Sequence, residues 1–151
     1  MNNGATTMTP TKKSAETNRV LDLPEAVKKS CVAKLKELRE AVGGISTIGL
    51  VSPDGFEVAW ISTATLPVSK ISALASTLVA VAHSYTREVG LSECRELIID
   101  TDLGCSLLMD VTVEGRTYGL LIAAEDTALL GRVLSKARAC AKELKDVIAA
   151  R

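Results

Sequence analysis

Residues 71–86 read ISALASTLVAVAHSYT and contain no Lys, Arg, Asp or Glu. Apolar side chains recur there at the 3.6-residue period of a helix, which predicts an amphipathic helix at the centre of the chain. Its apolar stripe comprises Ile71, Leu74, Ala75, Leu78, Ala82, Tyr85 and Val89. We expect this stripe to be buried by the protein's own domain.

The opposite face of the same helix is small and nearly uncharged. It carries Ser72, Ser76, Ala80 and His83, whereas a solvated helix face usually carries Lys and Glu. We therefore expect a partner, such as a second copy of the chain, to cover this face. A central helix within one larger core is the alternative. The segment is too short and too polar to span a membrane.

Composition narrows the class of protein. The chain has 151 residues, of which 47% are hydrophobic and 3% aromatic, and its 18 basic and 18 acidic residues balance. This length predicts one domain. Without a basic excess or aromatic residues for base stacking, we expect no nucleic-acid partner. Four cysteines without CxxC spacing and a single histidine argue against a zinc site, and we interpret them as reduced cysteines of a cytoplasmic protein.

Residues 1–22 are rich in Asn, Thr, Ser and Lys, which predicts a flexible polar tail ahead of a domain at residues 23–151. Within that domain, helices are predicted at 24–42, 69–90 and 126–150, and strands at 45–51, 56–62, 95–101, 105–113 and 116–124. Pro24, Ser69 and Asp126 are expected to begin the three helices. Gly43 and Gly90 are expected to end the first two.

Three of the connections between strands are hairpin-short, and the clearest is Ser52-Pro53-Asp54-Gly55. Strands joined in this way must be antiparallel, because a parallel crossover needs about a dozen residues. The stretch 120–124 is apolar on both sides, which is typical of a strand covered by helices on both faces. The expected fold class is therefore α+β: a five-stranded antiparallel sheet with helices on both faces, in the order α-β-β-α-β-β-β-α.

Few residues are candidates for catalysis. His83 has Arg87 at i+4, which has the wrong charge to orient a catalytic imidazole, although a Cys–His pair with Cys94 or Cys105 stays open. Asp100, Asp102 and Asp110 surround one predicted turn, but their spacing matches no EF-hand loop. We expect a protein that is not an enzyme, with no catalytic, cofactor-binding or metal-binding residues.

The order of these segments resembles the roadblock family, which is related to dynein light chains and to bacterial regulators of Ras-like GTPases. The matching segments are 48–60 (IGLVSPDGFEVAW), 71–82 (ISALASTLVAVA), 96–99 (ELII), 104–111 (GCSLLMDV), 118–123 (YGLLIA) and 129–132 (LLGR). They cover about residues 25–150. The resemblance implies a profilin-like fold and a homodimer in which third strands pair edge to edge and central helices lie side by side.

The resemblance also implies where partners bind. The partner and dimer face of the helix would comprise Lys70, Ser72, Ser76, Ala80, His83 and Arg87. The dimer edge strand would comprise Arg95, Leu97, Ile98 and Ile99. Arg87 could be an arginine finger, but activators of this family are thought to act by reshaping the GTPase.

Three hypotheses of function follow. The first is a non-catalytic homodimeric adaptor or regulator that binds a small Ras-like GTPase and can modulate its GTP hydrolysis. The second is a structural scaffold in a cytoskeletal, motility or signalling assembly, without a GTPase. The third is a small-molecule sensor, which predicts an apolar cavity near Trp60 and Tyr118.

Overall fold

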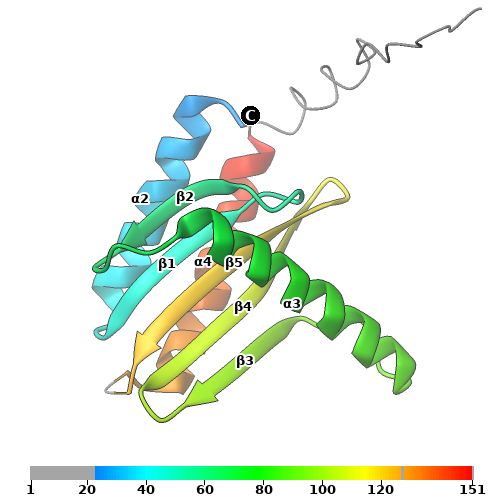
Figure 1. Ribbon diagram of the computed structural model, residues 1–151. Coiled ribbons are helices and arrows are strands. Elements are labelled where there is room, and N and C mark those ends of the chain that lie inside the picture. The colour runs from blue at the N-terminus through cyan, green and yellow to red at the C-terminus, as the bar shows by residue number, and fades with distance from the viewer. Residues whose placement is uncertain (1–22, 127, 151) are drawn as a thin grey trace, which may run out of the picture.

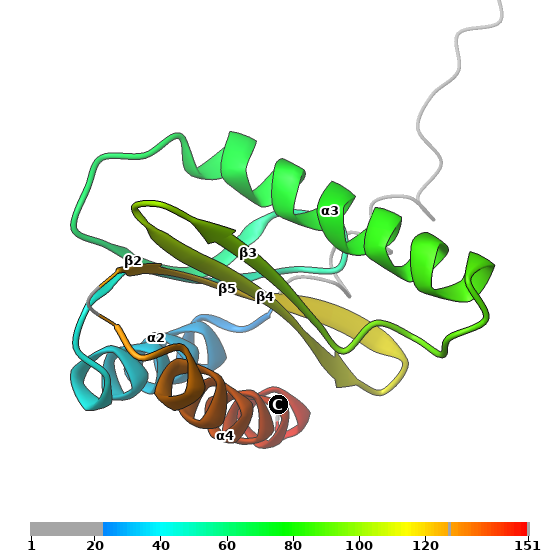
Figure 2. The same cartoon turned by 90° about the horizontal axis from the view of Figure 1, so that it is seen from below.

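Three layers make up the computed structural model, which describes residues 23–126 and 128–150. A five-stranded antiparallel sheet lies in the middle, with α3 on one face and α2 and α4 on the other (Figures 1 and 2). The helices are α2 (Glu25–Ala41), α3 (Val68–Glu88) and α4 (Leu130–Ala149). The strands are β1 (Ile45–Val51), β2 (Glu57–Ser62), β3 (Glu96–Thr101), β4 (Gly104–Val113) and β5 (Arg116–Glu125). The predicted fold class and element order are confirmed.

The strands lie in the order β2-β1-β5-β4-β3, so β2 and β3 are the two edges of the sheet. The β4–β5 hairpin turns at Glu114 and Gly115, whose φ angles are 50° and 76°. Positive φ at both central positions matches the twist of the flanking strands. The predicted hairpins and their antiparallel pairing are confirmed.

The main core lies between the sheet and the α2–α4 pair. The predicted α2 stripe supplies Cys31, Leu35, Leu38 and Val42, all buried. One face of β4 supplies Leu107, Met109, Val111 and Val113, as its alternation predicted. β5 contributes to both sides of the sheet, with Leu120 in this core and Leu121 in the smaller cluster beneath α3.

The face of α3 that packs on the sheet was predicted only in part: Ala75 of the predicted stripe is buried and Ile71 is partly buried beside it, but the large side chains are not. Ser72 and Ala75 are the buried residues of this helix, and Val79 packs against the cluster of Ala75, Leu108 and Leu121. Leu74 and Tyr85, expected to be buried, are 54% and 65% exposed. The small side chains let α3 lie close to the sheet, and they leave its large apolar residues pointing outward.

Two helix starts also differ from prediction. Pro67 is the N-terminal cap residue of α3 and makes no side-chain cap bond, so Ser69 lies inside the first turn instead of capping the helix. α4 is capped by Leu129 and begins four residues after Asp126, because Ala128 N–H bonds the Glu125 carbonyl in a separate turn. The predicted tail, 1–22, lies outside the described residues. No helix in the part of the chain that the structure describes has both the length and the apolar character to cross a membrane.

Candidate functional site

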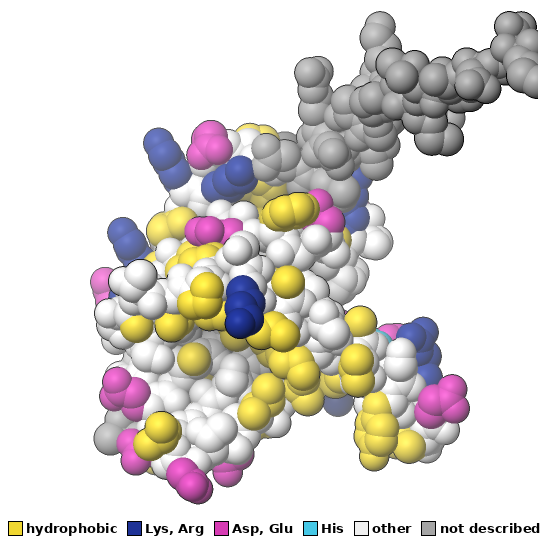
Figure 3. Space-filling model, viewed as in Figure 1, with side chains coloured by type: hydrophobic (Ala, Val, Ile, Leu, Met, Phe, Trp, Pro, Cys, Tyr) yellow, Lys and Arg dark blue, Asp and Glu magenta, His cyan; other side chains and the backbone are white. Residues whose placement is uncertain are grey.

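The outer side of α3 carries a row of exposed apolar side chains. We call this the α3 apolar row, and it comprises Leu74, Leu78, Val81, Tyr85 and Val89. The first four are spaced by four, three and four residues, which is the spacing of a helix–helix seam. In the space-filling view, yellow side chains follow α3 across the molecule (Figure 3). Contiguous apolar patches of this kind mark interaction sites on soluble domains.

Strand β3 forms the sheet edge beside this helix. It pairs with β4 on one side, and its other side faces away from the sheet. Of the predicted edge residues, Ile98 and Ile99 are exposed, whereas Leu97 packs inward against the cluster beneath α3. Arg95 lies one residue before the strand and is exposed. An apolar strand edge in this position is a ready template for pairing with another chain.

Glu96, the first residue of β3, is anchored to the opposite layer. Arg138 of α4 donates to both Glu96 oxygens, with 2.9 Å between Arg138 Nη2 and Glu96 Oε2. These hydrogen bonds lower the pKa of the Glu96 carboxyl, against the raising effect of its partial burial. The ion pair holds one end of the exposed edge strand in place.

The predicted partner face of α3 is divided by the structure. Ser72 is fully buried against the protein's own sheet, so it is not available at the surface. Ser76 and His83 are half-buried, and Lys70, Ala80 and Arg87 are exposed. The predicted face is thus partly the underside of α3, and the α3 apolar row was missed as a surface because its residues are typical of a core.

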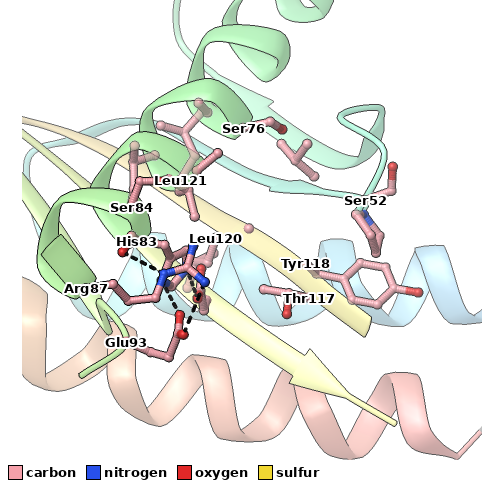
Figure 4. A pocket seen from close by; sticks show the side chains of 18 residues that line it. Ser52, Ser76, His83, Ser84, Arg87, Glu93, Thr117, Tyr118, Leu120 and Leu121 are labelled. Atoms are coloured by element: carbon pink, nitrogen blue, oxygen red, sulfur yellow. Dashed lines mark hydrogen bonds and ion pairs between the residues drawn. The ribbon is translucent and has the colours of Figure 1, made fainter. Parts of the chain in front are cut away.

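A groove of about 470 Å³ lies between α3 and the sheet (Figure 4). Small residues of α3, including Ala75 and Ala80, line it above Gly119 of β5. A Cβ atom added at position 119 would meet no atom within 4 Å, so there is open space above this glycine. Tyr118 belongs to the lining and Trp60 does not, so the groove differs from the cavity that the sensor hypothesis predicted.

His83 stands at the polar end of this groove between two carboxylates. Its Nε2 lies 2.8 Å from Asp110 Oδ2, and its Nδ1 lies 2.8 Å from Glu93 Oε2. Arg87 reaches the same place, with its Nη1 at 4.0 Å from Glu93 Oε1. These charged groups satisfy one another, which is unlike a small-molecule site whose polar groups converge on a ligand.

The two carboxylates that contact His83, those of Glu93 and Asp110, were not predicted from the sequence. Asp110 lies on β4 beside Leu108, on the face toward α3, and not in the turn of Asp100 and Asp102. Burial raises the pKa of Asp110, and the nearby His83 opposes that rise. The predicted grouping of three aspartates is therefore wrong. Among the described residues, no three His, Cys, Asp or Glu side chains are placed to hold a metal ion.

The open question of a Cys–His pair has a structural answer for Cys94. Its thiol donates to the Glu96 carbonyl at 3.3 Å, while its backbone N–H points to His83 Nδ1 at 3.3 Å. The imidazole therefore faces the backbone of Cys94 and not its sulfur. All four cysteines carry free thiols, with Cys31 and Cys140 buried.

The layers, the sheet order and the hairpins together define a Roadblock/LC7 fold. The chain is similar to the gliding protein MglB from Thermus thermophilus, with a TM-score of 0.77 and 17% identity over 87% of this chain and 97% of that chain. It is also similar to MglB in a tetrameric arrangement, with a TM-score of 0.76 and 18% identity over 85% and 94%. A Roadblock/LC7 domain from Streptomyces avermitilis matches with a TM-score of 0.66 and 18% identity over 74% and 91%.

No protein-family model and no curated protein matches the chain. At these identities the structural likeness shows the fold, and it confirms the predicted resemblance to roadblock proteins at that level.

Proposed function

We propose that this protein is a homodimeric, non-catalytic regulator or adaptor that binds a small Ras-like GTPase. The observation that carries the proposal is the α3 apolar row lying beside the exposed edge strand β3. A second copy would cover both features at once, by helix packing and by strand pairing. The resemblance to roadblock regulators and the fold shared with MglB support the GTPase as the further partner.

The exposed row supports the proposed self-association energetically. Leu78 and Val81 lie at the middle of the row and are 41% and 60% exposed. Burying apolar surface stabilises an interface by roughly 25 cal/mol per Å² before the cost of association. Pairing of β3 with its copy would add backbone hydrogen bonds along an edge that otherwise stays open.

The GTPase would contact the rim of the paired helices. Lys70, Ala80 and Arg87 stay exposed there, whereas Ser72 is excluded by its burial. Arg87 is engaged within the chain, since its Nε donates to the His83 carbonyl at 3.3 Å. That contact favours a role for Arg87 in shaping the helix end over a free arginine finger. The protein would act in the cytoplasm, without a cofactor.

The test has two independent measurements. Light scattering of the purified full chain gives its mass, for which we expect twice that of one chain. Affinity capture from native lysate, run in parallel with GDP and with a non-hydrolysable GTP analogue, then identifies the partners by mass spectrometry. Retention of a Ras-like GTPase that depends on the nucleotide is the expected result.

A dimer that retains other proteins and no GTPase in either nucleotide state would replace the regulator proposal with the structural scaffold. A monomeric mass at all accessible concentrations would overturn the assignment of the α3 apolar row and β3 to self-association. The two results are separable because the mass measurement needs no GTPase.

A further inference from the structure

One ring nitrogen of His83 lies close to both a hydrogen-bond acceptor and a hydrogen-bond donor. Nδ1 lies 2.8 Å from the Glu93 carboxylate and 3.3 Å from the backbone N–H of Cys94. A carboxylate can only accept a hydrogen bond, and a backbone N–H can only donate one. Glu93 and Cys94 lie next to each other in the connection between α3 and β3.

The protonation state of the imidazole decides which of these contacts is favourable. With a proton on Nδ1, His83 is a cation that donates to Glu93, and the Cys94 N–H has no lone pair to bond. Without that proton, Nδ1 accepts from Cys94 and repels the Glu93 carboxylate. When Nδ1 accepts from the Cys94 N–H, a neutral imidazole carries its proton on Nε2, which then donates to Asp110 Oδ2 at 2.8 Å; in the cation both nitrogens carry protons and this contact is kept.

We propose that His83, Glu93 and Cys94 form a proton-operated latch on the connection between α3 and β3. In the charged state Glu93 binds Nδ1 and holds the connection against the end of α3. In the neutral state Glu93 is released, and Nδ1 accepts the hydrogen bond of the Cys94 N–H. Of the three groups, only the imidazole nitrogen can change from acceptor to donor, so the gain or loss of one proton on Nδ1 operates the latch.

Other charged groups around the imidazole are compatible with this scheme. α3 supplies Arg87, whose guanidinium lies close enough to Glu93 to receive it when His83 releases it. β4 supplies Asp110, whereas the Tyr118 side chain of β5 points away from the imidazole and is not part of this group (Figure 4). Glu93 is 67% exposed, so its release needs no rearrangement of the core, whereas His83 and Asp110 are largely enclosed at 18% and 21%.

The latch connects to the surface proposed for self-association. The Cys94 thiol donates a hydrogen bond to the Glu96 carbonyl, and Glu96 is the first residue of the edge strand β3. The latch therefore sets how β3 leaves the end of α3, and both elements belong to the proposed dimer interface. This consequence rests on the proposed function: we expect the charged latch to fix the interface and to strengthen self-association as the pH falls.

The imidazole can be observed without ambiguity, because His83 is the single histidine of the chain. We expect its NMR signals and the Cys94 amide signal to titrate together in the native protein. In Glu93→Gln, the proton affinity of His83 should fall about tenfold, as expected for the loss of one adjacent opposite charge. Glu57→Gln, which removes an exposed carboxylate from β2, is the matched control and should leave the titration unchanged.

Two results would overturn the latch: an unchanged His83 titration in Glu93→Gln, or a Cys94 amide that does not follow the imidazole. These measurements use the protein alone, so they do not depend on whether a GTPase binds. The regulatory step is decided separately by sedimentation at pH 6 and pH 8. A pH-dependent association that Glu93→Gln abolishes supports it, and the same pH dependence in both proteins overturns it.

Discussion

Gly49 of β1 lies directly opposite Trp60 of β2, and the six-membered ring of the indole occupies the space of a side chain at position 49. The aromatic ring can take this position only because that side chain is missing. Trp60 then packs against the cluster of Ala75, Leu108 and Leu121 beneath α3. The pair therefore couples the edge hairpin to the underside of the helix.

Gly49→Ala should destabilise the fold by about 1–3 kcal/mol, the usual cost of forcing an extra group into a packed site. Denaturant unfolding followed by Trp60 fluorescence measures this directly, since the chain has one tryptophan. Gly119→Ala is the matched control in a strand, because a Cβ there meets nothing within 4 Å. Equal unfolding midpoints for the two variants would contradict the packing described for Gly49.

Val81→Glu should shift the protein from dimer to monomer without unfolding it. Val81 lies in the α3 apolar row and is exposed within one chain, but a carboxylate there would be buried without a partner in the proposed dimer. Such burial costs several kcal/mol, enough to weaken association by a factor of about 100 or more. Light scattering over a range of concentrations measures the change.

Leu129→Glu provides the control for that experiment, because Leu129 is 73% exposed and precedes α4 on the opposite layer. It places the same charge on an exposed apolar position outside the proposed interface. If both variants keep the mass of the native protein, α3 is not the surface through which copies associate.

The sequence predicted those elements whose two faces differ clearly. The α2 stripe of Cys31, Leu35 and Leu38 alternates with Lys and Glu, so the buried side was unambiguous. The hairpins carry Asp54-Gly55 and Glu114-Gly115, whose backbone preferences fix the turns. Hydrophobic periodicity and turn chemistry are local properties, and they predicted the order of elements along the chain and the three hairpin pairings. The β1–β5 pairing joins strands far apart in the sequence and was not predicted.

Neither face of α3 carries the charges that mark a solvated surface, so its orientation could not be derived in this way. Large apolar residues were assigned to the core of the same chain, whereas Leu74 and Tyr85 point outward and Ser72 inward. The contacts of His83 could not be predicted either, because Glu93 and Asp110 reach the imidazole from different parts of the chain. One signal existed: Asp110 lies two residues after Leu108 in β4, so both side chains point to the same covered face of the sheet.

Thiol modification should distinguish the two layers of the molecule. Burial raises the pKa of Cys31 to about 11 and that of Cys140 to about 12, where nearby acidic groups add to the effect. The thiolate is the reactive form, so both cysteines should resist iodoacetamide in the native protein. Cys94 and Cys105 are half-buried and should react first.

Mass spectrometry of digests at successive times gives the rate for each thiol. In denaturant all four should react at similar rates, which controls for the reagent. Modification of Cys140 as fast as that of Cys94 in native buffer would show that α2 and α4 are not packed as described.

Acid should weaken the link between α4 and the edge strand. Because hydrogen bonds from Arg138 depress the pKa of Glu96, the unfolded chain binds this proton more readily than the folded chain does. The ion pair therefore contributes stability above the ordinary glutamate pKa of about 4.3, and that contribution is lost as the pH falls through the lower folded value. The effect should be small, since Arg138 is exposed to solvent.

Arg138→Ala should lower the thermal midpoint slightly at pH 7 and by less at pH 3, where Glu96 is increasingly protonated in both proteins. Lys142→Ala removes an exposed cation from the same helix and serves as the control, with no such pH dependence. An equal deficit for Arg138→Ala at both pH values would mean that Arg138 stabilises the fold by packing and not by its charge. In that case the contacts between β3 and α4 would not depend on the protonation of Glu96, and the edge strand would keep its position over the whole pH range.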